Sequence, residues 1–188
     1  MVETLLAHGS VDPNWPDDSG KTPLSHAAQD GLEGVVKMLL GRPQVNPDKE
    51  DPSGKTPLSF AAENGHVRVV EILLGQYRVN PDKPNIHGQT PLSYAASGGH
   101  EEVVKILLGR GDVNPDKPDN DGRTPLMCAT LGRHEGVVKI LLPREGVNPN
   151  KRDNDGQTPL MVATLLGFQE VITLLQSHEV ETPAQPEA

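Results

Sequence analysis

The tripeptide Thr-Pro-Leu recurs five times in this chain of 188 residues, and every interval between successive copies is 34 residues. The copies begin at Thr22, Thr56, Thr90, Thr124 and Thr158. A glycine stands two residues before each copy, and a second column of prolines, each two residues after a valine, keeps the same interval. A fixed period of this length is typical of arrays in which one supersecondary unit is stacked many times. We therefore predict a single repeat array with no second domain.

Most glycines and prolines of this array occupy fixed positions within the repeat. The chain holds 19 Gly and 18 Pro, and about a quarter of its residues are Leu, Ile, Val or Phe. Such a composition lies close to the limits that characterise disordered chains. However, at least 22 of the 37 Gly and Pro residues fall in columns spaced by 34 residues. Most of them are therefore expected at helix caps, turns and helix ends.

Within one unit, residues 79–112, local signals predict two short helices. Thr90 is a suitable N-cap and a proline follows it at the first helical position, where its missing N–H costs nothing. A second helix is expected from Glu101 to the glycine at 109, with an apolar face too wide for a helix surrounded by water. Each helix is shorter than the roughly 12–15 residues that an isolated helix needs. We predict an all-α solenoid in which neighbouring units stabilise one another.

Charge and composition exclude several classes of partner and location. The net charge of −9 disfavours binding to a phosphate backbone, so we expect no nucleic acid partner. No apolar run approaches the length of a membrane-spanning helix, and no secretory signal stands at the N-terminus. The single cysteine, Cys128, excludes an intramolecular disulfide framework. We expect a cytoplasmic protein without a membrane partner.

Motifs for phosphate or calcium binding are incomplete. Gly-Lys-Thr at 20–22 and 54–56 lacks the upstream glycine and buried strand of a phosphate-binding loop. Asp-Asn-Asp-Gly at 119–122 and 153–156 lacks the first ligand and the bidentate glutamate of a calcium loop. These segments are interpreted as turns rich in Asx side chains.

A column of three histidines, His66, His100 and His134, also repeats every 34 residues. Packed helices lie roughly 8–10 Å apart, whereas zinc ligands lie roughly 2.0–2.1 Å from the ion, so one metal cannot bridge the column. We expect each ring to bond the loop backbone of a neighbouring unit. Cys128 shares a column with Phe60 and other core-type residues, which favours a packing role. No catalytic residue, cofactor or metal is predicted.

The repeated pattern Gly-x-Thr-Pro-Leu-x-x-Ala-Ala-x-x-Gly-His-x-x-Val-Val-x-x-Leu-Leu resembles the ankyrin repeat, and 54–74 and 88–108 match it closely. The resemblance implies helix-turn-helix units with β-turn fingers. The family's usual histidine after Thr-Pro-Leu is replaced by Ser25, Ser59, Ser93, Met127 and Met161. The hydrogen bond from that histidine to the threonine is therefore expected to be missing. This 34-residue variant is similar, more narrowly, to the C-terminal ankyrin arrays of fungal nucleotide-binding receptor-like proteins.

The repeat register sets the expected boundaries. We predict an array over 1–178, with a partial second helix at 1–8, and a disordered acidic tail over 179–188. Five repeats are expected to start near positions 11, 45, 79, 113 and 147. Because the chain starts inside a repeat, we expect it to be a fragment of a larger multidomain protein.

The fourth repeat departs from the others at two helix ends. Arg133 and Pro143 stand where the other repeats have glycine, except that the last repeat has serine at the second place. We therefore predict that the helix ends of this repeat close differently and that the array departs from regular curvature there.

Positions at which the residue differs from repeat to repeat are not needed to form the turns, the helix caps or the core. In ankyrin arrays, the resemblance implies, such positions line a concave groove that binds a partner. The predicted partner-binding residues are Asp18, Ser19, Lys21, Pro52, Ser53, Lys55, Asn64, Ile86, His87, Gln89, Ser97, Asn120, Asp121, Arg123, Leu131, Asn154, Asp155, Gln157 and Leu165. Ile86, Leu131 and Leu165 are the sharper candidates, because an apolar residue in a polar groove suggests a contact patch. The competing explanation is drift on a solvated surface.

These observations predict a monomeric, non-catalytic scaffold that binds another protein. Three alternatives remain open: a regulatory or substrate-recruiting arm of an enzyme located upstream, an architectural spacer, and catalysis within this chain.

Overall fold

The computed structural model describes residues 12–76 and 78–181, and this part of the chain contains ten helices and no strand. Five short inner helices follow the Thr-Pro-Leu motifs: α2 (Pro23–Gln29), α4 (Pro57–Glu63), α6 (Pro91–Ser97), α8 (Pro125–Leu131) and α10 (Pro159–Leu166). Each is followed by an outer helix: α3 (Glu33–Leu40), α5 (Val67–Leu74), α7 (Glu101–Leu108), α9 (Glu135–Leu141) and α11 (Gln169–Glu181).

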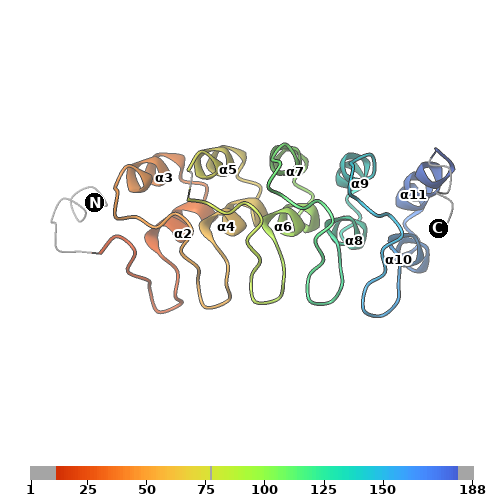
Figure 1. The fold of residues 1–188 in the computed structure, drawn as a ribbon, viewed down its shortest axis with the longest axis horizontal. Coiled ribbons are helices and arrows are strands. Elements are labelled where there is room, and N and C mark those ends of the chain that lie inside the picture. The colour runs from red at the N-terminus through yellow and green to blue at the C-terminus, as the bar shows by residue number, and fades with distance from the viewer. Residues whose placement is uncertain (1–11, 77, 182–188) are drawn as a thin grey trace.

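The helices form two parallel rows, and a hairpin loop, here called a finger, projects before each inner helix (Figure 1). Each inner helix packs on its own outer helix and on the inner helices of adjacent repeats. The prediction of an all-helical repeat solenoid is confirmed. Among the described residues, no helix is long and apolar enough to cross a membrane.

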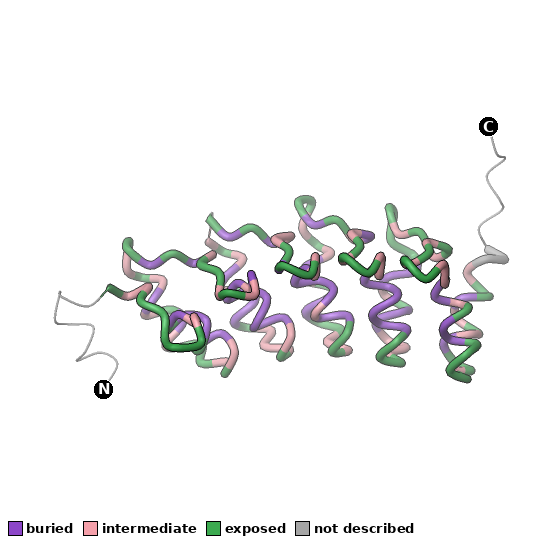
Figure 2. Tube along the Cα trace, turned by 90° about the horizontal axis from the view of Figure 1, so that it is seen from below, coloured by how far each residue is buried: buried purple, intermediate pink, exposed green. Residues whose placement is uncertain are grey.

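The core is a continuous layer between the rows, and Figure 2 shows the buried stretches recurring in each repeat. The leucine of each of the first four Thr-Pro-Leu motifs is at most 1% exposed, as are the valine pairs of α5, α7 and α9. Paired alanines such as Ala61 and Ala62 are fully buried where the inner helices meet. Since this layer depends on adjacent repeats, stability is expected to follow from nearest-neighbour interfaces.

The motif threonine caps every inner helix. The hydroxyl oxygen of Thr90, for example, accepts from the Ser93 N–H, and the Ser93 hydroxyl lies 2.8 Å from the Thr90 N–H, which donates to it. The serine that replaces the family's histidine therefore restores a side-chain bond to the threonine. Met127 and Met161 cannot form it, so the predicted loss of this bond is confined to repeats four and five.

Two lateral ladders of side chains join consecutive repeats. The Nε2 atoms of His66, His100 and His134 donate over 2.8–2.9 Å to the carbonyl oxygen of the last residue of the preceding inner helix, so the predicted bond to a neighbouring repeat is confirmed but its acceptor lies at a helix end rather than in a loop. At the base of the fingers, Lys117 and Lys151 each donate to the backbone and carboxylate oxygens of an aspartate in the preceding repeat over 2.8–2.9 Å. Both ladders fix the spacing of the repeats.

The fingers are also bonded to one another. The backbone N–H groups of Ile86, Asn120 and Asn154 each donate to a carbonyl oxygen of the preceding finger over 2.9–3.0 Å. The equivalent residue in the second finger is Pro52, which has no N–H, so this bond cannot form between the first two fingers. The finger row is therefore tied by backbone bonds from the second finger to the fifth.

The fourth repeat only partly follows the prediction of altered helix ends. Arg133 has φ of 57°, in the left-handed region occupied by the equivalent glycines, so the end of α8 closes as in the other repeats and the prediction is wrong there. At the second end, α9 stops at Leu141 and is one residue shorter than α3, α5 and α7. The departure from regular curvature stays a prediction.

The predicted ends of the array fall partly outside the described residues. The partial helix predicted at 1–8 lies there entirely, as do residues 182–188 of the predicted tail. Helix α11 continues to Glu181, so the prediction of a disordered tail is wrong for its first three residues, 179–181.

Candidate recognition groove

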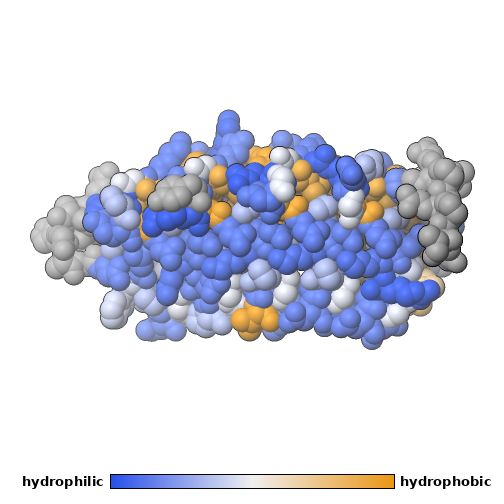
Figure 3. Space-filling view, viewed as in Figure 1, coloured by the Kyte–Doolittle hydropathy of each residue, from blue (hydrophilic) through white to orange (hydrophobic). Residues whose placement is uncertain are grey.

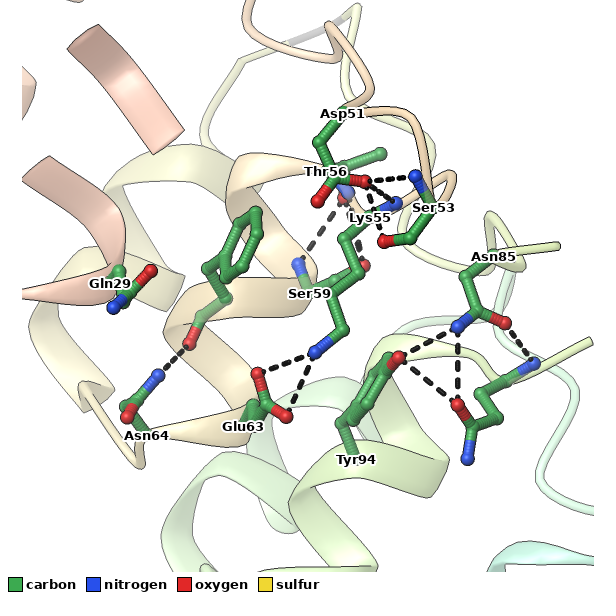
Figure 4. A network of polar contacts seen from close by, with 12 residues as sticks. Gln29, Asp51, Ser53, Lys55, Thr56, Ser59, Glu63, Asn64, Asn85 and Tyr94 are labelled. Carbon is green, nitrogen blue, oxygen red and sulfur yellow. Dashed lines mark hydrogen bonds and ion pairs between the residues drawn. The ribbon is translucent and has the colours of Figure 1, made fainter. Parts of the chain in front are cut away.

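A groove lies between the fingers and the inner helices, and its two sides are in contact in the first two repeats. The Lys21 ammonium donates to the Gln29 side-chain oxygen over 2.7 Å. In the next repeat, the Lys55 ammonium donates to both carboxylate oxygens of Glu63 over 2.9 Å (Figure 4). The finger residue after the glycine therefore lies opposite the residue eight positions later, near the end of the inner helix. In the third repeat the equivalent residues, Gln89 and Ser97, both line one cavity.

Each finger has its shape fixed by an Asx side chain. One carboxylate oxygen of Asp51 accepts from the N–H groups of Ser53 and Lys55 and from the Ser53 hydroxyl (Figure 4). The same backbone bonds recur around Asp17, Asn85, Asp119 and Asp153. The fingers are thus shaped by internal bonds and need no partner to order them.

The ionisation of Asp17 supports the same hydrogen-bonded shape in the first finger. Hydrogen bonds from the Ser19 hydroxyl, from His26 and from the Lys21 N–H hold the pKa of the Asp17 carboxyl well below its usual range. The carboxylate is therefore ionised at neutral pH and remains an acceptor for the turn.

Two aromatic rings accompany the lysines on the helix side of the groove. The Lys55 ammonium lies 4.5 Å from the centroid of the Tyr94 ring and 5.4 Å from that of Phe60. The Lys21 ammonium lies 4.7 Å from the same Phe60 centroid. Cation–π attraction and the bonds to Gln29 and Glu63 together hold both ammonium groups within the groove wall. These lysines are less free to meet a partner than an exposed cation.

A cavity of about 600 Å³ begins at the Lys55–Glu63 pair and extends into the third and fourth repeats. It is lined by Ser53, Lys55, Glu63, Asn85, His87, Gln89, Ser93, Tyr94, Ser97, Gly98 and Cys128. The Asn85 side chain donates to the Tyr94 hydroxyl over 2.7 Å, and that hydroxyl donates to Gln89 (Figure 4). Burial raises the pKa of Tyr94 to about 12, so the phenol stays protonated at neutral pH. Most residues that line the cavity carry polar side chains, and hydrogen bonds hold those of Asn85, Gln89 and Tyr94 in place.

Cys128 lies at the far wall of this cavity but is poorly suited to act as a nucleophile. Burial raises the pKa of its thiol to about 12, and the nearby Asp119 carboxylate contributes to the shift. The reactive thiolate is therefore scarce at neutral pH. Within the described ranges, no three His, Cys, Asp or Glu side chains lie close enough together to hold a metal ion.

The structure brings only part of the predicted set together. Five predicted residues line the cavity: Ser53, Lys55, His87, Gln89 and Ser97. Six other lining residues were not selected: Glu63, Asn85, Ser93, Tyr94, Gly98 and Cys128. Glu63 shares its column with Ser97, and that shared position was the available signal for including it. Asn85 and Tyr94 could be found only from the contact between a finger and a helix.

Three predicted residues have structural roles in the finger row. The Asn120 and Asn154 side chains donate to backbone oxygens of the preceding finger over 2.8–3.0 Å. Pro52 lies against the first finger, at the place where a Cβ added to Gly20 would meet its ring. These side chains are at least partly committed to contacts within the chain.

The three apolar candidates are all exposed. Ile86 is 61% exposed, and Figure 3 shows an isolated hydrophobic patch at the tip of the third finger, where it lies. Leu131 is 41% and Leu165 is 77% exposed, both near the ends of inner helices. All the remaining predicted residues are exposed or half-buried.

Fold and groove together define a helical repeat solenoid with a row of fingers along one side. Residues 35–119 and 111–185 match the family model described as ankyrin repeats (3 copies). The match spans most of the chain, which therefore belongs to the ankyrin repeat family. Ankyrin repeats are generally protein–protein interaction modules and are typically non-catalytic. Among proteins with curated descriptions, none is similar enough to this chain to give a significant match.

Proposed function

We propose that this chain is a non-catalytic recognition module that binds a protein partner in the groove between its fingers and inner helices. The observation that carries the proposal is the 600 Å³ cavity between the third finger and its inner helix. Its walls are held by internal bonds, so binding demands little ordering of the groove, which lowers the entropic cost of association.

Two of the alternatives make different demands on the groove. A spacer needs no exposed apolar side chain on that face, so the exposure of Ile86, Leu131 and Leu165 favours recognition. A regulatory or substrate-recruiting arm of an enzyme would use the same groove and differs only in what the array is joined to. Sequencing the open reading frame beyond both ends of this segment distinguishes that arrangement.

We also propose a cytoplasmic, monomeric module within a larger protein. The 34-residue repeat and the similarity to fungal receptor-like arrays support a sensing role, in which binding here regulates a neighbouring domain. The departure from the 33-residue repeat usual for the family is the sequence feature on which this narrower proposal depends.

A capture experiment tests the recognition groove. The wild-type chain and the variant Ile86→Ser/His87→Ala/Leu131→Ser are immobilised, and proteins retained from an extract of the source cells are compared by quantitative mass spectrometry. We expect at least one protein to be retained by the wild type and lost, by tenfold or more, with the variant.

The matched control is Trp15→Ser/Leu32→Ser, which changes two exposed apolar residues of the first repeat, outside the third finger and α8. The control is expected to retain the same protein, and all three chains should melt within a few degrees of one another. Capture that survives the groove substitutions would show that the partner binds elsewhere.

A further inference from the structure

The groove is bridged in the first two repeats and open in the last three. Gln29 and Glu63 bond the lysines opposite them, as described above. The equivalent helix residues in the later repeats are Ser97, Leu131 and Leu165. A leucine cannot accept a hydrogen bond, and the Arg123 guanidinium opposite Leu131 pairs instead with Asp121 of its own finger, at 3.3 Å.

The exposure of these helix residues also differs between the first two repeats and the last three. Gln29 and Glu63 are half-buried, whereas Ser97, Leu131 and Leu165 are exposed. The cavity starts at the bridge formed by Glu63 and extends toward the later repeats. The exposed residues at this position of the inner helices therefore lie in repeats three to five.

The exposure of Leu131 is not an effect of the end of the array. Met161, on α10, is 48% exposed where its counterpart Met127 is 1% exposed, because a following inner helix covers only the latter. Leu131 does have a following inner helix, α10, and is still 41% exposed. This column faces the groove rather than the next repeat, so Leu131 and Leu165 offer apolar contacts to an occupant.

The fingers opposite these leucines are acidic. The fourth and fifth fingers, over 119–123 and 152–157, hold four aspartates and two basic residues: Arg123, which pairs with Asp121, and Arg152, which donates to the Gly156 carbonyl oxygen. Asp121 and Asp155 occupy equivalent, exposed positions near the tips. An apolar column facing carboxylates is complementary to a segment with apolar residues on one side and basic residues on the other.

We propose that the groove binds a basic amphipathic helix of a protein partner, lying across repeats three to five; this rests on the proposed recognition function. Its apolar side chains contact Leu131 and Leu165, and its lysines or arginines face Asp121 and Asp155. Packed helices lie roughly 8–10 Å apart, which sets the spacing between the two leucines. Residues seven apart on a helix are separated by about 10.5 Å along its axis, which fits that spacing.

The test uses fluorescently labelled peptides of defined composition and the full chain. The probe repeats Leu-Lys-Lys-Leu-Leu-Lys-Leu twice, one control peptide has Glu in place of every Lys, and another has Ser in place of every Leu. Binding is measured by fluorescence anisotropy at neutral pH in about 0.15 M salt, where screening is physiological. We expect the Leu-Lys peptide to bind at least tenfold more tightly than either control.

Substitutions then locate the site. Leu131→Ser/Leu165→Ser is expected to weaken binding of the Leu-Lys peptide tenfold or more. Asp121→Asn/Asp155→Asn is expected to weaken it several-fold and to reduce its salt dependence. The matched controls are Leu32→Ser, an exposed leucine in the first repeat, and Glu33→Gln, an exposed carboxylate on the outer helix α3; both should bind as the wild type does.

The proposal is overturned if the Leu-Glu peptide binds equally well, if the Leu-Lys peptide does not bind, or if the first-repeat controls weaken binding as much as the groove variants. Circular dichroism melting checks that each variant is folded. Peptide failure together with partner capture that is lost in the Ile86→Ser/His87→Ala/Leu131→Ser variant would reject the helix and keep the recognition function. Capture unaffected by groove substitutions would reject both.

Discussion

Residue by residue, the array couples a glycine in one repeat to a histidine in the next. A Cβ added to Gly31 or Gly99 would lie 2.7 or 2.5 Å from Nδ1 of the following repeat's histidine. Arg133 holds the same backbone position with φ of 57°, and the residue in the following repeat's histidine column is Phe168. Where the histidine is absent, a side chain is tolerated at the glycine position. This coupling explains why the substitution of the glycine does not disturb the end of α8.

Arg133 still carries the backbone strain of a left-handed conformation. The strain costs roughly 1 kcal/mol for a residue with a Cβ and little for glycine. The ion pair of Arg133 with Glu170, at 3.5 Å and well exposed, compensates only weakly. We therefore expect Arg133→Gly to be more stable than Arg133→Ala by about 1 kcal/mol in chemical denaturation, because both variants lose the arginine contacts and only one keeps the strain.

Gly99→Ala serves as the reference for that comparison. It adds the same strain together with the clash against the His134 ring, so it should destabilise the chain by clearly more than the difference between the two Arg133 variants. Equal stability of Arg133→Gly and Arg133→Ala would contradict the assignment of strain to this position.

Among the elements, the fingers behave as a row tied by backbone bonds. Asn120 donates to the third finger through its N–H over 2.9 Å and through its side chain over 3.0 Å. The equivalent residue of the second finger is proline, which shows that the backbone of this column accepts a proline ring. The pair Asn120→Pro and Asn120→Ala therefore separates the backbone bond from the side-chain bond.

We expect Asn120→Pro to be less stable than Asn120→Ala by about 1 kcal/mol, the usual net contribution of one backbone hydrogen bond. Urea denaturation measures the difference, and hydrogen exchange should show faster exchange of the neighbouring finger amides in the proline variant. If proline is as stable as alanine here, the bonds between fingers contribute nothing to the array.

The elements were predicted well because their signals are local. The Thr-Pro cap and the glycine at 109 are local signals, and the structure begins α6 at the predicted proline and has both ends of α7 within one position of the predicted residues. The groove was predicted less well because its contacts join different columns. Lys55 bonds Glu63 and lies over the ring of Tyr94 in the next repeat. These three residues occupy different positions of the repeat, so comparing the repeats position by position does not bring them together.

For the molecule as a whole, the stability of a repeat depends on what covers it. Met127 and Met161 have the same residue type and the same place in their inner helices, but they are 1% and 48% exposed. Removing a buried methionine side chain commonly costs about 2–5 kcal/mol, whereas a half-exposed one leaves little cavity. We expect Met127→Ala to destabilise the chain by at least 2 kcal/mol and Met161→Ala by less than 1 kcal/mol.

Chemical denaturation of both variants, followed by circular dichroism, makes this comparison with one type of substitution. Nearest-neighbour stabilisation requires the difference, since the interface between α8 and α10 exists for Met127 and has no counterpart beyond α10 among the described residues. Similar losses for the two variants would mean that something covers Met161 in solution, and a dependence of the Met161→Ala effect on protein concentration would identify that cover as a second copy of the chain.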